Sequence, residues 1–147
     1  MPSAHHVAWS LMEGERAFGQ ATRSRRRASL TRRLFRRCAE CAQLIVHDQR
    51  ALTRRTAGAT GVQEIPVAAI TGTVEPSRAR EFDSEFRPSP RMRKRWLRVW
   101  NAEHTGPGLP PISVIRVGDG YAIRDGHHRV SVAKALGALT IRSVVAA

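Results

Sequence analysis

The sequence predicts an α+β fold: a small mixed sheet with packed helices, preceded by a basic helical N-terminal extension. After residue 61, segments rich in β-branched residues alternate with segments of helical periodicity. The tight turn GDG at 118–120 separates two β-branched segments, as it would in a hairpin. Before residue 61, arginine-rich sequence carries apolar residues at helical spacing. These three observations define the class.

The composition is strongly basic. The 147 residues carry 25 Lys+Arg against 12 Asp+Glu, a formal net charge of +13. This excess favours polyanionic partners such as nucleic acid or nucleotides. Nearly all the basic residues are arginine, which is typical of a high-GC bacterial gene. No apolar run reaches the length of a membrane span and no secretory segment opens the chain, so we expect a cytoplasmic protein that does not enter a membrane.

The small-residue segment TAGATG at 56–61 is typical of a linker. We therefore expect residues 1–61 to form an Arg-rich helical extension and residues 62–147 to form the main domain. Within the extension, residues 23–55 are predicted to be helical, with an apolar seam that packs on the main domain or on a second copy, giving a homodimer. The seam residues follow spacings of 4, 3, 4 and 7 and are Leu34, Cys38, Cys41, Ile45 and Leu52.

The arginines of the extension fall largely on other faces of this predicted helix. They are candidates for contacts with DNA phosphates, and the alternative is a solvated basic helix. The candidate residues are Arg25, Arg26, Arg27, Arg32, Arg33, Arg36 and Arg37.

The motif CAEC at 38–41 has the spacing of half a zinc site or of a redox pair. Only His47 lies nearby as a further ligand, and the motif falls in the middle of the predicted helix. We therefore interpret both cysteines as small core residues.

The first elements of the main domain follow in order. VQEIPVAAI at 62–70 is predicted to be a strand, and the proline-punctuated segment 75–90 a loop anchored by Phe82 and Phe86. Ser89 and Pro90 have the signature of a helix start, which predicts a helix over 91–104. Its apolar stripe, interpreted as core, is Met92, Trp96, Val99 and Trp100.

The last elements are two paired strands, a helix and a closing strand. ISVIRV at 112–117 and YAIR at 121–124 form the predicted hairpin. A helix opening at about His127 is expected to turn Val130, Ala133 and Leu136 inward and to end at Gly137. TIRSVV at 140–145 is the predicted final strand.

The sequence DGHHR at 125–129 lies between a strand and a helix. A helix start exposes unpaired N–H groups and the positive end of the helix dipole, and Gly126 lets a ligand approach the backbone. Arg129 can add a bidentate guanidinium, while His127 and His128 can add single donors. This pattern predicts an anion site, most naturally for phosphate.

Other interpretations of these residues stay open. Metal binding by adjacent histidines is poor geometry because neighbouring side chains on a helix point about 100° apart. One histidine can be structural, bonding a backbone carbonyl. Asp125 can bind a sugar hydroxyl, a cation or Arg129, can act as a base, or can cap the helix.

The segment PPISVIRVGDGYAIRDGHHRVSVAKALGALTIRSVVA resembles the second half of the ParB/sulfiredoxin superfamily, and IPVAAI and RAREFD resemble its leading strand and arginine loop. The resemblance covers about 62–146. It implies that Gly126, His127, His128 and Arg129 form a phosphate box, with Arg78 or Arg80 as a second contact. In ParB chromosome-partitioning proteins that box binds a nucleoside triphosphate, CTP, and the output is a clamp on DNA.

The sequence departs from both named families. Sulfiredoxins carry a catalytic cysteine where this sequence has His127, which argues against that activity. Partition proteins continue into a helix-turn-helix domain, whereas this sequence ends at Ala147. The segment EPSRAR replaces the pattern that usually precedes the loop arginine, so cytidine selectivity is not implied.

We therefore expect a stand-alone, ParB-like nucleotide-binding module, DNA-associated or regulatory, with slow hydrolysis of nucleoside triphosphates at most. The same fold hosts a free-serine kinase, so a magnesium-dependent small-molecule phosphotransferase is the alternative, and a nuclease is a weaker one. An interaction protein that dimerises through the helix seam is a third hypothesis. The candidate catalytic residue is Asp125, and further candidate carboxylates are Glu81, Asp83 and Glu85.

Overall fold

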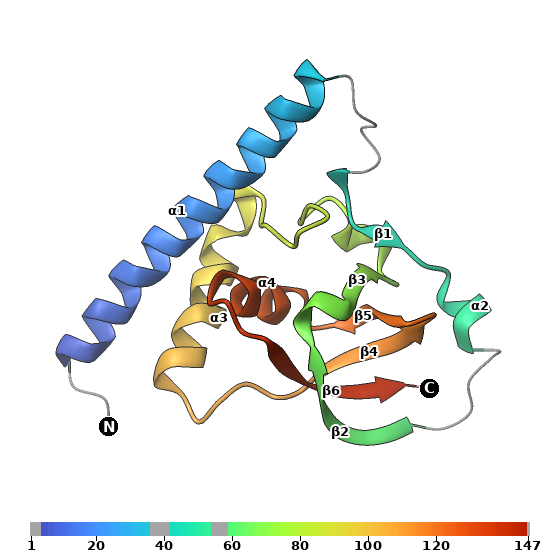
Figure 1. Ribbon diagram of the computed structural model, residues 1–147. Coiled ribbons are helices and arrows are strands. Elements are labelled where there is room, and N and C mark those ends of the chain that lie inside the picture. The colour runs from blue at the N-terminus through green and yellow to red at the C-terminus, as the bar shows by residue number, and fades with distance from the viewer. Residues whose placement is uncertain (1–3, 36–41, 54–58, 147) are drawn as a thin grey trace.

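The protein is described by a computed structural model that covers residues 4–35, 42–53 and 59–146, and it confirms the α+β class (Figure 1). The helices of these residues are α1 (Ala4–Leu34), α2 (Gln49–Thr53), α3 (Arg93–Thr105) and α4 (His127–Ala135). The strands are β1 (Ile45–Val46), β2 (Ala59–Pro66), β3 (Ile70–Thr73), β4 (Ile112–Val117), β5 (Gly120–Asp125) and β6 (Thr140–Ala146).

The strands form one mixed sheet in the order β1-β3-β5-β4-β6-β2. The strands β1, β3 and β5 run parallel to one another, and β4 pairs antiparallel with β5 through the predicted hairpin. The last strand, β6, lies between β4, to which it is parallel, and β2, to which it is antiparallel. The sheet therefore joins segments that are far apart in the chain.

The helices α3 and α4 lie on one side of the sheet, and α1 packs against the outer side of α3 (Figure 1). The indole of Trp96 on α3 donates to Ser131 Oγ on α4 at 2.8 Å. The indole of Trp100 donates to the Ser10 carbonyl on α1 at 3.1 Å. Gly14 makes the approach of α1 possible, because a Cβ there would lie 2.7 Å from Trp100 Cδ1. The predicted core role of both tryptophans is confirmed.

The loop between β3 and α3 is anchored as the sequence predicts. Phe82 and Phe86 are 0% and 1% exposed and belong to the central core. That core lies between the sheet and α4 and also contains Ile65, Ile112 and Val130. A smaller cluster that includes Ile115 takes in Leu52 of α2.

The predicted helix over 23–55 is wrong in its second half. The helix α1 ends at Leu34, and Ile45 and Val46 form an edge strand. This β-branched pair bonds with β3, where Gly72 leaves room: a Cβ there would lie 2.4 Å from the Ile45 carbonyl oxygen. The predicted helical seam is not formed, because Ile45 lies on a strand and not on the helix that contains Leu34. Cys38 and Cys41, and with them the CAEC motif, lie outside the described residues.

Two local predictions also need correction. The segment 62–70 is two strands instead of one, because a 3₁₀ turn, η2 (Val67–Ala69), follows Pro66 and sends β2 and β3 to different places in the sheet. Leu136 is 43% exposed rather than buried, and Val132 is buried instead. Gly137, with φ of +71°, ends α4 as predicted.

Candidate functional site

The helix α4 begins where the sequence predicts, immediately after Gly126. Gly126 has φ of +110°, in the left-handed region. A Cβ there would lie 2.4 Å from Ile112 Cγ2, so both backbone angle and space require glycine. The chain can therefore turn sharply from β5 into α4 beside β4.

Arg129 is bound within the protein. Its guanidinium donates to Asp125 Oδ2 at 2.7 Å, to the Pro111 carbonyl at 2.9 Å and to the Pro110 carbonyl. These contacts hold the segment before β4 against α4. The structure therefore corrects the prediction that Arg129 offers an open guanidinium for bidentate binding. Arg129 supplies positive charge near the start of α4, but most of its N–H groups already donate to protein acceptors.

His127 is buried and partnered. Its Nε2 lies 2.7 Å from Thr73 Oγ1 on β3. Burial lowers the pKa of His127 to about 4, and the positive charge of Arg78 lowers it too. The imidazole is therefore neutral at pH 7 and fixes the start of α4 to the sheet.

His128 is also buried, at 5% exposed, but it lacks a polar partner. Neither of its ring nitrogens has a hydrogen bond to any described residue. Its ring packs edge-on against Phe82, with centroids 5.1 Å apart. Burial lowers its pKa to about 4, with a further contribution from the charge of Arg95. An unpartnered buried polar group of this kind costs roughly 1–3 kcal/mol, so it calls for an explanation.

A small cavity of about 90 Å³ opens at the start of α4. The residues that line it are Arg78, Arg95, Val99, Asp125, Gly126, His127, His128 and Arg129. All four members of the predicted phosphate box are present, and Arg78 joins them from the loop as expected. Arg78 also pairs with Glu81 at 2.7 Å.

Arg95 also lines the cavity, although the sequence pattern does not single it out among the arginines of the helix. It lies on α3 four residues before Val99, and both line the cavity. No ion pair joins Arg95 to a described residue. The only local signal is that i, i+4 spacing, which is weak because α3 carries several arginines.

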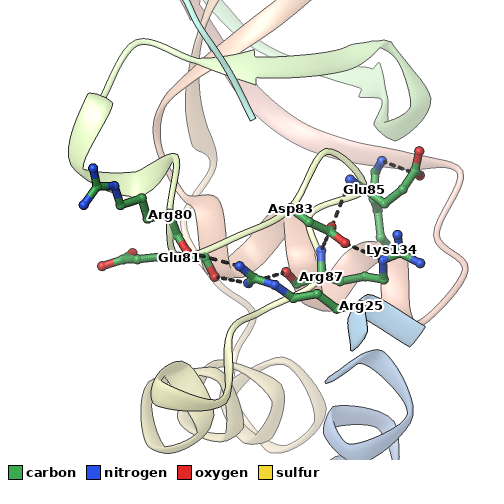
Figure 2. Close-up of polar contacts among 7 residues, drawn as sticks. All are labelled: Arg25, Arg80, Glu81, Asp83, Glu85, Arg87 and Lys134. Atoms are coloured by element: carbon green, nitrogen blue, oxygen red, sulfur yellow. Dashed lines mark hydrogen bonds and ion pairs between the residues drawn. The ribbon is translucent and has the colours of Figure 1, made fainter. Parts of the chain in front are cut away.

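Arg80 does not reach the cavity. It is exposed, and its backbone carbonyl accepts a hydrogen bond from Arg25 Nη2 at 3.2 Å. Arg25 Nη1 donates to the carbonyls of Glu81 at 3.0 Å and Arg87 at 3.3 Å (Figure 2). Burial lowers the pKa of Arg25. Arg25 is thereby removed from the predicted DNA-contacting set, because its guanidinium fastens α1 to the loop.

The other arginines of that set differ in environment. Arg26, Arg27 and Arg33 are exposed, and Arg32 is half-buried. Arg36 and Arg37 lie outside the described residues.

The candidate carboxylates separate into structural and exposed groups. Asp83 is 2% exposed and accepts from Arg87 Nε at 2.7 Å and from the amides of Glu85 and Arg87 (Figure 2). It shapes the loop and does not reach the cavity. Asp125 is the acidic group at the cavity, with its side chain 75% exposed.

The described residues form neither a cluster of metal ligands nor a membrane-spanning helix. Residues 4–35, 42–53 and 59–146 contain no group of three or more His, Cys, Asp or Glu side chains placed to hold a metal ion. None of the helices in this part of the chain is long and apolar enough to cross a bilayer.

Comparison of the chain with protein-family models, with curated proteins and with solved structures finds no match. The ParB/sulfiredoxin resemblance therefore stays a prediction.

Proposed function

We propose that the protein is a ParB-like binding module that takes the phosphate of a nucleotide, or of another phosphorylated small molecule, at the start of α4. The observation that carries the proposal is the convergence of Arg78, Arg95 and Arg129 on one small cavity, which His128 also lines.

The charges around the cavity favour an anion. Asp125 forms an ion pair with Arg129, and Glu81 forms one with Arg78, so these four charges offset one another. Arg95 adds a positive charge that no described carboxylate offsets. The N–H groups at the start of α4 add the positive end of the helix dipole. The balance at the cavity is therefore positive.

The size of the cavity restricts what it holds. Its volume of about 90 Å³ is roughly that of three water molecules in the liquid, which suits a single phosphoryl group. Neutral His128, which also lines the cavity, has one N–H that no described residue accepts.

Titration calorimetry with inorganic phosphate and a panel of nucleotides, with and without magnesium, tests the proposal. We expect the wild type to bind, Arg95→Gln to weaken binding at least tenfold, and Arg98→Gln to bind like the wild type. Arg98 is the matched control, an exposed arginine on the same helix that does not line the cavity. Absence of binding in the wild type, or equal binding by Arg95→Gln, would contradict the proposal.

A second candidate function is nonspecific DNA binding through α1, and it is supported by the exposed arginines of that helix. From Arg16 to Leu34 the sequence contains no acidic residue, and Arg26, Arg27 and Arg33 are exposed. Such a surface gains affinity by releasing counterions from DNA.

Fluorescence anisotropy of a duplex DNA at several salt concentrations tests this second function. The triple variant Arg26→Gln, Arg27→Gln, Arg33→Gln should bind more weakly, and its plot of log affinity against log salt should be shallower by about one unit for each lost phosphate contact. An unchanged slope would exclude α1 as the DNA surface.

A further inference from the structure

A second and larger cavity shares the lining residue Arg129 with the small cavity at the start of α4, which is called the phosphate cavity below. It measures about 350 Å³ and lies between α4, the end of α3 and the segment before β4. Binding sites for organic ligands usually measure about 300–1,000 Å³, so this cavity has a suitable size and the phosphate cavity alone does not.

The two cavities follow the same pair of helices. On α3, Arg95 and Val99 line the small cavity, and Glu103 lines the large one. These positions are four residues apart and share a helix face, and eight residues span about 12 Å along the axis. On α4, Arg129 lines both cavities. The cavities are therefore neighbours along the α3–α4 pair, with Arg129 between them.

The chemistry of the two cavities differs. The walls of the large cavity include the apolar side chains of Leu109, Ile112, Val132 and Ile141. Its lining also contains the carboxylates of Glu64 and Glu103 and the guanidinium of Arg142, all on exposed residues. The two carboxylates can accept hydrogen bonds from the hydroxyl or amino groups of a ligand.

From this arrangement we infer that the ligand is a phosphomonoester: one phosphoryl group in the small cavity and an apolar or aromatic body in the large cavity, with its donor groups toward Glu64 and Glu103. This inference rests on the proposed phosphate site and adds the class of molecule that carries the phosphate. It distinguishes a compact organic monophosphate from a free phosphate ion.

The inference is tested by calorimetric titration of the full chain with inorganic phosphate and with phenyl phosphate. Burial of the ring should make phenyl phosphate bind at least about tenfold more tightly than inorganic phosphate. Ala133→Leu fills part of the large cavity, which Ala133 lines, and should abolish most of this difference while leaving the affinity for inorganic phosphate unchanged.

Two further variants keep the result interpretable. Ala135→Leu makes the same change on the same helix at an exposed residue that does not line the large cavity, and it should behave like the wild type. If Ala133→Leu unfolds, Ala138→Leu replaces it, since Ala138 lines the same cavity from an exposed position beyond α4.

Each outcome decides a different point. Binding of inorganic phosphate with no gain for phenyl phosphate overturns this inference and leaves the phosphate site standing. A gain for phenyl phosphate that persists in the folded cavity-filling variant places the ring elsewhere and also overturns this inference. If neither compound binds, the proposed function itself fails, and the inference fails with it.

Discussion

The backbone of Gly126 lies directly against the side chain of Ile112, so closely that a Cβ at position 126 would be 2.4 Å from Ile112 Cγ2. This contact joins the start of α4 to the first residue of β4. It fixes the position of the N–H groups on which the proposed phosphate site depends.

Gly126→Ala should therefore destabilise the protein by more than the backbone angle alone explains. We expect a loss on the order of 2–4 kcal/mol in the free energy of unfolding, because strain at positive φ adds to overpacking against Ile112. Urea denaturation measures it. Gly118→Ala is the matched control, since Gly118 also has positive φ but no atom lies within 4 Å of an added Cβ. Equal losses in both variants would contradict a role for the Ile112 contact.

Replacing Arg25 should loosen the attachment of α1 to the loop. Arg25→Gln removes donors from the carbonyls of Arg80, Glu81 and Arg87, and we expect a loss of about 2 kcal/mol in the free energy of unfolding. Arg26→Gln, at the adjacent exposed position, should change it by less than about 0.5 kcal/mol. Urea denaturation of both variants measures the change in stability, and the anisotropy titration with duplex DNA measures the change in DNA affinity. A structural Arg25 affects the first measurement, and an Arg25 that contacts DNA affects the second.

The buried histidines should make stability depend on pH. Burial lowers the pKa of both His127 and His128 from 6.5 to about 4, so the unfolded state binds protons first as the pH falls. The free energy of unfolding should be at its full value above pH 6.5 and fall progressively between pH 6.5 and 4, by on the order of 2 kcal/mol for each histidine at pH 5.

Denaturation midpoints in urea at pH 7.5, 6.5, 5.5 and 4.5 measure this dependence. His128→Phe should remove about half of the slope, and because Phe leaves no polar atom at this apolar contact with Phe82, the variant should fold. A slope that this variant leaves unchanged would show that His128 is not a source of the pH dependence.

Asp125→Asn should strengthen phosphate binding. The carboxylate lines the cavity and opposes an anion there, so removal of its charge should raise the affinity for inorganic phosphate roughly three- to tenfold. Calorimetry measures the affinity, and a phosphate-release assay with nucleoside triphosphates measures turnover. Loss of turnover with unchanged affinity would instead assign Asp125 the role of a base.

The elements that local sequence predicts best are those whose signals are complete within a few residues. The hairpin around GDG, the start of α4 after Gly126 and its end at Gly137 each depend on a glycine at positive φ. Their prediction needed no knowledge of the rest of the chain.

The remaining features depend on contacts between distant segments. The strand β1 has two residues, and it forms because it pairs with β3. The paired residues Ile45 and Gly72 are 27 positions apart in the chain. Arg95 reaches the cavity only because α3 packs on α4, and Arg25 is committed by a loop more than 50 residues away. Sequence periodicity contains no information about such partners, so the sequence alone predicts a DNA contact for Arg25 and does not place Arg95 at the site.

The position of β6 between β4 and β2 has a consequence for how the chain folds. Strand β2 begins at Ala59, but its pairing partner in the sheet starts at Thr140. During synthesis, β2 must therefore wait with its backbone unpaired in this sheet until about eighty more residues have emerged. Such long-range pairing slows folding relative to a helical chain of similar length, and it leaves the edge of an unpaired strand free to aggregate until β6 is made.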